Sequence, residues 1–309
     1  MKKSISVVIP FFNSGSCIGR MLDSILSSTY MPSEILLIDD GSTDNSKDVI
    51  SDYASRYPII KYVKKEHSGV SASRNLGIRL ATGDFINFLD SDDYIESNMY
   101  ELMIGAITDD SFDGSLCGYF THKDDEVTSY YSETLDVLYS EDILKGMFTD
   151  ENIRGFLVTR LFRTSLLKNC PLDEDISICE DLLLQSRLFT GGNYKFAYVK
   201  APLYHYIQNS GSATVSRSLF KDGEFVYAPA YDRIRQYVNT DYVNDSYSSI
   251  IDYNMYTMLL AYRRGDKSVL PQIRQLQALL RTIPMKKKDL HSIAYRYAPL
   301  LYSYKLPSD

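Results

Sequence analysis

Residues 84–93 read Asp-Phe-Ile-Asn-Phe-Leu-Asp-Ser-Asp-Asp, an apolar segment that runs into three carboxylates within four positions. The apolar part, residues 85–89, predicts a buried strand. Buried carboxylates are unfavourable unless they are paired or hold a cation. Such an oxygen cluster suits Mg²⁺ or Mn²⁺, which would take further oxygens from a phosphate-bearing substrate. The alternative is an Asp-rich turn in which Asp93 or Ser97 caps the next helix.

Three more apolar runs, at residues 4–10, 34–38 and 59–63, also predict buried strands. Between the strands, apolar residues recur at helical spacing, which predicts helices in the segments that follow each strand. Strands that alternate with helices through short links are typical of an α/β fold with a mostly parallel, doubly wound sheet. In such sheets, ligands bind beyond the carboxyl ends of the strands.

Polar clusters follow three of the predicted strands. Residues 10–13 read Pro-Phe-Phe-Asn, residues 39–42 read Asp-Asp-Gly-Ser, and residues 90–93 read Asp-Ser-Asp-Asp. A single Asp-rich turn is common, but strand ends of a parallel sheet meet at one edge, so these clusters should converge. Asp40 and Asp44 have two equally good interpretations: they bind a ligand, or they only form a turn and cap the following helix.

Composition limits the function classes. The 309 residues are 44% hydrophobic and 24% charged, as in ordinary globular proteins, and the net charge of −7 gives no sign of nucleic-acid binding. The four cysteines form no CxxC pattern, which argues against a disulfide framework or a zinc site and favours a cytoplasmic location. The first apolar run is too short and too interrupted for a signal peptide, and no run reaches the ~20 residues that span a bilayer.

Four motifs in order resemble family 2 glycosyltransferases with the GT-A fold. They are Val-Val-Ile-Pro-Phe-Phe-Asn at 7–13, Leu-Ile-Asp-Asp-Gly-Ser-Thr-Asp-Asn-Ser at 37–46, Gly-Val-Ser-Ala-Ser-Arg-Asn-Leu-Gly-Ile at 69–78, and the segment at 84–93. The resemblance covers roughly residues 4–215. It implies a catalytic GT-A domain over residues 1–219, and a helical pattern over residues 220–309 suggests a separate C-terminal region.

The resemblance also implies residue roles on the donor side. The strand ends would bind a nucleoside diphosphate sugar, most often a UDP-sugar. Asp39 would accept a hydrogen bond from the uracil imide, which suits a carboxylate. Arg74 would reach the base or the phosphates, where a fixed cation is useful. The other residues assigned to the nucleotide sugar are Pro10 and Phe12 around base and ribose, Asn13, Asp90, Ser91, and Ser210, which would close over the diphosphate.

A metal cofactor is implied as well, Mn²⁺ or Mg²⁺. Asp90 and Asp92 correspond to the family's Asp-x-Asp pair, in which one carboxylate meets the ribose and the other the metal between the phosphates. His205 would complete the coordination. The alternative for His205 is a strand histidine among tyrosines. The cation and Arg74 together would neutralise charge on the leaving diphosphate.

Residues 179–184, Cys-Glu-Asp-Leu-Leu-Leu, begin a predicted helix, where acidic residues are favoured by the helix dipole alone. By resemblance, Asp181 is the general base that takes a proton from the acceptor hydroxyl, with Glu180 as the second candidate. Attack opposite the leaving diphosphate would invert the anomeric centre without a covalent nucleophile.

The expected protein is therefore an inverting, metal-dependent glycosyltransferase that moves one sugar to a hydroxyl of a glycan or lipid-linked glycan, in bacterial surface polysaccharide synthesis. A processive synthase is disfavoured because no Gln-x-x-Arg-Trp motif and no Trp is present. A nucleotidyltransferase would need a Gly-rich loop after the first strand, where Pro10 to Asn13 stand instead. The alternative from another class is a non-catalytic nucleotide-sugar or glycan-binding module.

The last segment, residues 285–305, mixes basic residues with tyrosines and leucines. It could lie on an anionic membrane surface at the inner face of the membrane. The alternative is a helix docked on the core or on a second subunit, with a charged outer face.

Overall fold

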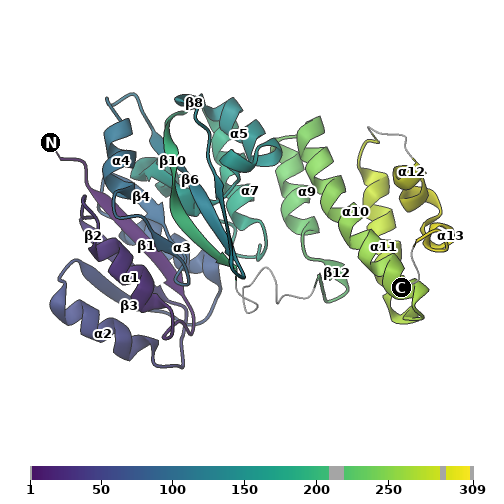
Figure 1. The fold of residues 1–309 in the computed structure, drawn as a ribbon, viewed down its shortest axis with the longest axis horizontal. Coiled ribbons are helices and arrows are strands. Elements are labelled where there is room, and N and C mark those ends of the chain that lie inside the picture. Colours follow the sequence, from purple (N-terminus) through teal and green to yellow (C-terminus); the bar gives the residue numbers. More distant parts are fainter. Residues whose placement is uncertain (1, 209–218, 286–289, 307–309) are drawn as a thin grey trace. The chain divides into compact units, whose positions relative to one another are not determined.

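The computed structural model describes residues 2–208, 219–285 and 290–306. The chain divides into two compact units, Met1–Val215 and Ser216–Asp309, here called unit 1 and unit 2 (Figure 1). Unit 1 is built on a ten-stranded mixed sheet with flanking helices, and unit 2 is mostly helical. The predicted fold, a mostly parallel sheet with a helical C-terminal region, is confirmed.

The sheet of unit 1 runs in the order β3-β2-β1-β4-β9-β6-β10-β5, with β7 beside β6 and β8 beside β10. Strands β1 to β4 pair in parallel, and so do β6 and β10, whereas β9 lies antiparallel between β4 and β6. The strands are β1 (Ile5–Phe11), β2 (Glu34–Asp39), β3 (Ile60–Lys64), β4 (Phe85–Phe88), β5 (Tyr94–Ile95), β6 (Gly114–Lys123), β7 (Glu126–Tyr130), β8 (Val137–Tyr139), β9 (Arg160–Arg163) and β10 (Lys195–Gln208).

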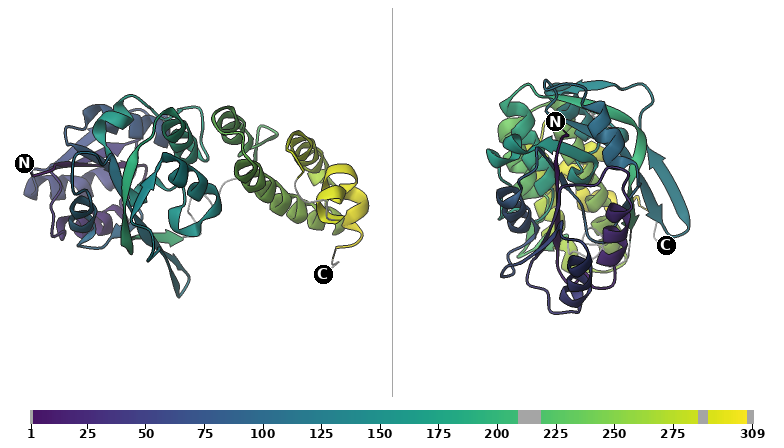
Figure 2. Two further views of the ribbon diagram at one scale, coloured as in Figure 1. Left: turned by 90° about the horizontal axis from the view of Figure 1, so that it is seen from above. Right: turned by 90° about the vertical axis from the view of Figure 1, so that its left-hand side faces the viewer.

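Helices lie on both sides of the strands (Figure 2). Side chains of a strand alternate between the two faces of the sheet. The odd-numbered residues of β1 point to one face, here called the first face, and share a core with the helices that cover it. On the other face, helix α3 comes so near that a Cβ on Gly77 would lie 2.2 Å from Val8 Cγ1, so only glycine fits. The helices of the first face are α1 (Ile18–Leu26), α2 (Ser46–Arg56) and α4 (Met99–Ala106); α3 spans Val70–Leu80.

Residues 122–140 complete β6 and form β7 and β8. Strand β7 is an edge strand with mostly exposed side chains, and it is joined to β6 through Asp124 at φ +52°. Helix α5 (Ser140–Thr149) follows β8. The remaining elements of unit 1 are the 3₁₀ turns η1 (Glu151–Ile153) and η2 (Leu157–Thr159), and the helices α6 (Thr164–Lys168) and α7 (Glu180–Gly191).

Unit 2 has a core of its own. Tyr231 and Tyr247 stack with ring centroids 4.5 Å apart, and both are buried. A short hairpin, β11 (Phe220–Lys221) with β12 (Glu224–Phe225), precedes the helices and was not predicted. The helices are α9 (Ala228–Tyr237), α10 (Asp241–Arg263), α11 (Leu270–Thr282), α12 (Leu290–Tyr297) and α13 (Pro299–Ser303), with the turn η3 (Lys267–Val269) before α11. None of the helices in the described ranges combines the length and hydropathy needed to cross a bilayer.

Candidate active site

The carboxyl ends of β1, β2 and β4 meet at one edge of the sheet, as predicted. Register places Phe11 of β1 beside Asp39 of β2. Beyond the strands, the backbone N–H of Asn13 donates to Ser42 Oγ at 2.9 Å, and the Ser14 and Ser91 hydroxyls are 2.8 Å apart. The three polar clusters therefore form one continuous rim.

The residues predicted to surround the base differ in exposure. Pro10 is buried within β1, whereas Phe12 is 47% exposed. The Phe12 ring lies against the imidazole of His67, with centroids 4.7 Å apart. The side-chain oxygen of Asn13 accepts from the backbone N–H of Thr43 at 2.9 Å, so this side chain fixes the loop after β2. Phe12 thus offers the free aromatic surface at this end of the rim.

Asp39 is buried and already accepts two hydrogen bonds, from the Tyr62 hydroxyl at 2.6 Å and from Ser42 N–H at 2.7 Å. Burial alone would raise the pKa of Asp39, but these hydrogen bonds outweigh it and the pKa lies below its ordinary value. Each oxygen keeps a lone pair, so an ionised acceptor for an N–H group is available.

Asp40 ties down the loop that leads into α3. Its carboxylate accepts from the backbone N–H groups of Ser68 and Gly69, each at 2.9 Å, and forms an ion pair with Lys65, and His67 Nδ1 lies 2.9 Å from Asp40 Oδ2. Gly69 has φ +93°, a conformation that favours glycine. The interpretation of Asp40 as a turn residue accounts for all of these contacts.

Arg74 joins the strand rim to α7. From α3, its buried guanidinium donates to Asp90 Oδ1 (3.1 Å from Nη2) and to Glu180 Oε1 (2.7 Å from Nη1). Burial lowers the pKa of Arg74, but the carboxylates of Asp90, Glu180 and Asp181 outweigh it and raise the pKa above its ordinary value. Four predicted site residues from three distant segments are thereby brought together.

The carboxylates after β4 have separate environments. Burial and the neighbouring charge of Asp90 raise the pKa of Asp92. Asp93 is buried, accepts from the Tyr204 hydroxyl and from the backbone N–H of Ile207 at 2.8 Å, and burial together with the two neighbouring carboxylates raises its pKa to about 8. Asp93 therefore anchors the loop to β10, which leaves Asp90 and Asp92 as the pair available at the rim.

The rim supplies some, but not all, of the oxygen ligands that a hard cation needs. The charge of Asp90 contributes, after burial, to the raised pKa of Asp92, so the two carboxylates lie near enough to serve as oxygen ligands of one ion. Within the described residues, no group of three His, Cys, Asp or Glu side chains is placed to hold a metal ion. The two carboxylates fit a Mg²⁺ or Mn²⁺ whose remaining ligands are waters and substrate oxygens.

His205 is engaged elsewhere. Its Nδ1 is 2.8 Å from His122 Nε2, its Nε2 is 2.9 Å from Glu96 Oε1, and its ring is stacked between those of Tyr94 and Phe120. Because both ring nitrogens have partners, the structure does not bring His205 together with the Asp90–Asp92 pair as a metal ligand. The alternative, a strand histidine among aromatic residues, describes its surroundings. Ser210 lies outside the described residues.

Asp181 occupies the start of α7, after Cys179 in the left-handed conformation (φ +59°). Burial and the adjacent Glu180 raise the pKa of Asp181 well above the ordinary carboxylate range, whereas Arg74 acts in the opposite direction. Its Oδ1 accepts from the backbone N–H of Leu182 at 2.7 Å. A carboxylate with a raised pKa, next to the rim, has the properties of a general base.

Arg160 is a residue that the sequence analysis missed. Its side chain is fully buried at the start of β9, and its guanidinium donates to the carbonyls of Ile153 (2.9 Å) and Arg154 (2.7 Å) rather than to a carboxylate. Burial lowers the pKa of Arg160 to about 10, and the charge of Asp181 opposes this more than any other group does. A charged residue inside the apolar run 156–162 was the available signal.

Gln185 connects the same loop to α7. Its amide donates to the carbonyl of Gly155 at 2.6 Å and to that of Asp181 at 3.2 Å. A Cβ on Gly155 would lie 2.7 Å from Leu182 Cδ1, so the loop packs directly on the first turn of α7. The loop between η1 and β9 is therefore held against the helix that carries the candidate base.

This chain resembles known proteins in sequence. The profile described as Glycosyl transferase family 2 matches residues 6–169. EpsH of Bacillus subtilis (strain 168) is 30% identical over 233 residues, which cover 72% of this chain and 67% of EpsH. The minor teichoic acid biosynthesis protein GgaB of the same organism is 27% identical, and the matched region covers 68% of this chain but only 24% of GgaB.

The fold has a solved counterpart. The crystal structure of S. aureus TarS 1–349 in complex with UDP-GlcNAc superposes with a TM-score of 0.72 at 20% identity, covering 98% of this chain and 89% of that one. This likeness concerns the fold. The profile match and the relationship to EpsH establish that the chain belongs to glycosyl transferase family 2.

Proposed function

We propose that this chain is an inverting glycosyltransferase that moves a single sugar from a UDP-sugar to a hydroxyl of a glycan or lipid-linked glycan. The observation that carries the proposal is the position of Arg74, which bonds both to Asp90 at the strand rim and to Glu180 next to Asp181. Donor-side and acceptor-side carboxylates therefore lie around one buried cation.

On the donor side, Asp39 would accept from the uracil imide and Phe12 would cover the base. TarS, which shares the fold, has been crystallised with UDP and with UDP-GlcNAc, and this supports a uridine donor. Asp90 and Asp92 would hold Mn²⁺ or Mg²⁺ with the diphosphate. When bound, the ion supplies positive charge that favours departure of the diphosphate.

On the acceptor side, Asp181 would take the proton of the attacking hydroxyl. The acceptor oxygen attacks the anomeric carbon from the side opposite the diphosphate, so the C–O bond to the diphosphate breaks as the new one forms and the configuration inverts. Glu180, held by Arg74, keeps the start of α7 in place and is the positioning residue in this scheme.

The acceptor class is inferred from relatives. GgaB is named for minor teichoic acid biosynthesis, and its similarity supports a role in bacterial surface polysaccharide synthesis. We place this reaction in the cytoplasm, where nucleotide sugars are made, with a lipid-linked acceptor at the inner face of the membrane.

A panel of UDP-sugars tests the proposal, with UDP release and product formation measured with and without Mn²⁺. Turnover of one donor that requires the cation and is lost in Asp181→Asn supports it. Binding of UDP-sugars without turnover for any donor or acceptor would instead indicate a nucleotide-sugar-binding module.

A further inference from the structure

The outer face of α12 and α13 carries large apolar side chains in solvent. Leu301, Tyr304 and Tyr297 are 74%, 73% and 63% exposed, and Leu290 and Ile293 are exposed as well. Residues 290, 293 and 297 follow the i, i+3, i+7 spacing of one helix face, and 301 and 304 are again three apart. These five side chains are here called the outer face of unit 2.

These helices are exposed on one side only, because their other side is docked. Tyr295 and Tyr302 are buried and pack edge to face, with ring centroids 5.7 Å apart. Arg296 is buried between α12 and α11, where its guanidinium donates to the carbonyls of Leu280 and Ile283. The outer face is therefore presented by a fixed scaffold. A docked helix usually turns charged residues outward, but here the outward residues are aromatic and aliphatic.

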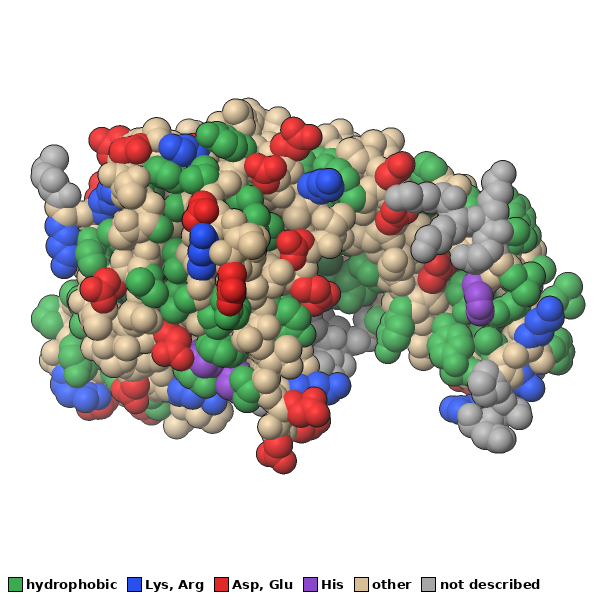
Figure 3. Space-filling view, turned by 45° about the horizontal axis from the view of Figure 1, so that its top comes forward, with side chains coloured by type: hydrophobic (Ala, Val, Ile, Leu, Met, Phe, Trp, Pro, Cys, Tyr) green, Lys and Arg blue, Asp and Glu red, His purple; other side chains and the backbone are tan. Residues whose placement is uncertain are grey.

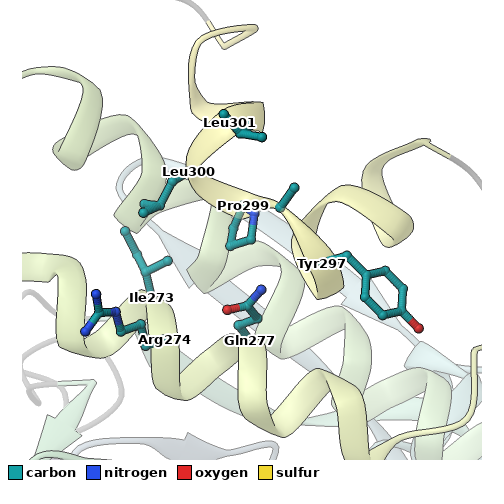
Figure 4. A pocket seen from close by; sticks show the side chains of 8 residues that line it. Ile273, Arg274, Gln277, Tyr297, Pro299, Leu300 and Leu301 are labelled. Carbon is teal, nitrogen blue, oxygen red and sulfur yellow. The ribbon is translucent and has the colours of Figure 1, made fainter.

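A pocket of about 280 Å³ lies beside this face (Figure 4). Tyr297, Leu300 and Leu301 line one side of it, and Ile273, Arg274 and Gln277 of α11 line the other. The lining is thus apolar, with one cation and one amide. Such a pocket has room for part of a lipid headgroup or the end of an alkyl chain, and it is smaller than most ligand sites.

The stretch of sequence that carries the outer face is basic. Residues 267–308 contain eight Lys or Arg and a single acidic residue, Asp289. Arg274 lines the pocket, the guanidinium of Arg281 lies 5.9 Å from the Tyr297 ring centroid, and Lys305 follows Tyr304. Figure 3 shows hydrophobic and basic side chains gathered next to one another at the right-hand end of unit 2. Charge and apolar surface therefore coincide.

We propose that the outer face of unit 2 docks on an anionic lipid bilayer, with the tyrosines and leucines in the interfacial region and the arginine and lysine side chains on lipid phosphates. Tyrosine is favoured at this depth because its ring is apolar and its hydroxyl remains hydrated. Basic residues near an anionic surface each add to binding. A second copy of the chain is a poorer occupant, because a two-fold contact through this face would bring like charges together.

Flotation with lipid vesicles tests the proposal on the full chain and requires no catalytic activity, so its outcome is independent of the proposed function. The intact protein should float with vesicles that contain phosphatidylglycerol and should remain at the bottom with phosphatidylcholine alone or in high salt. The double variant Tyr297→Ser/Leu301→Ser should lose most of the bound fraction. Arg274→Gln/Lys305→Gln should weaken binding by about fivefold for each cation removed.

The matched control is Val127→Ser on the exposed strand β7 of unit 1. This variant loses an apolar side chain of 58% exposure and should float as the intact protein does. Circular dichroism melting shows whether each variant is folded. The proposal is overturned if the intact protein does not float with anionic vesicles, or if Tyr297→Ser/Leu301→Ser floats equally. It is also overturned if light scattering shows a dimer that this variant dissociates while no vesicle binding is seen.

Discussion

The two units of this chain use charge in opposite ways. Residues 1–215 contain 31 acidic and 19 basic residues, whereas residues 216–309 contain 9 acidic and 14 basic ones. In unit 1 the charges of the candidate site are partnered, as the buried Arg74 is by Asp90 and Glu180. In unit 2, Arg274, Arg281 and Lys305 remain exposed beside large apolar side chains. Buried, partnered charges suit chemistry on a small substrate, and exposed charges beside apolar groups suit a broad surface.

Substitution of the candidate base in unit 1 should have the largest effect, and that effect is on the rate of sugar transfer. Asp181→Asn should lower the rate of sugar transfer by about a thousandfold, within the usual range for a general base. Donor binding should be retained, because the amide keeps the shape of the side chain. Initial rates and UDP affinity are the measurements, and Asp125→Asn on the exposed β6–β7 turn is the matched control. Transfer at the wild-type rate would remove Asp181 from the mechanism.

Glu34 tests whether buried carboxylates also stabilise unit 1. Burial would raise its pKa, but hydrogen bonds from Lys61, Ser6 and Thr82 outweigh this and hold the pKa at about 2, below the ordinary 4.5. The Glu34 carboxylate therefore binds a proton more readily in the unfolded chain than in the folded one. The stabilisation from its ionised form is complete above about pH 4.5 and is lost as pH falls toward 2.

The expected cost of Glu34→Gln at neutral pH is about 2 kcal/mol of unfolding free energy, after allowance for solvent screening of the half-exposed Lys61. Chemical denaturation at several pH values measures it. The difference from wild type should shrink as pH falls below about 4.5. A difference that is constant with pH would show that charge is not its source.

The pH dependence of transfer should report the environment of Asp181. Because burial and Glu180 raise the pKa of Asp181, kcat/KM should fall with decreasing pH at a value above the ordinary carboxylate range. Arg160→Met removes a cation that interacts with the Asp181 carboxylate, so this acidic limb should move to higher pH. Arg160→Lys keeps the charge and should restore most of the shift. An unchanged limb in Arg160→Met would mean that the guanidinium acts only through the loop it holds.

The smallest effect concerns the outer face of unit 2. Leu301→Ser should change the unfolding free energy by no more than about 0.5 kcal/mol, as is usual for exposed sites. The buried Leu276 on α11 is the matched comparison, and Leu276→Ala should cost about 3 kcal/mol. Equal losses in both variants would show that Leu301 is covered in solution.

The sequence predicted the parallel half of the sheet well. The runs at 4–10, 34–38 and 85–89 became β1, β2 and β4 within one or two residues, because strands buried on both faces read as continuous apolar runs. The convergence of their polar ends followed from topology. The antiparallel strand β9 was not predicted, since a four-residue strand with an arginine at its start carries little periodic signal.

Contacts between distant segments were beyond the sequence. Motifs singled out Arg74, Asp90 and Glu180 separately, but only the fold joins Arg74 to Glu180, 106 positions away. The family resemblance suggested His205 as a metal ligand. Its contacts with His122 and Glu96, 83 and 109 positions away, could not be anticipated from the sequence. The sequence also could not predict that Leu301 and Tyr304 are exposed, because a helical pattern of apolar residues does not show which of them are covered.

The central claim is that Asp90 and Asp92 hold a divalent cation together with the diphosphate of the donor. Calorimetric titration of UDP with and without Mn²⁺, on the wild type and on Asp92→Asn, tests it most directly. Because the pKa of Asp92 is already raised, its amide variant should remain folded. The account predicts that Mn²⁺ strengthens UDP binding to the wild type by about tenfold or more and leaves binding to Asp92→Asn unchanged. Equal enhancement in both proteins, or none in the wild type, would contradict it.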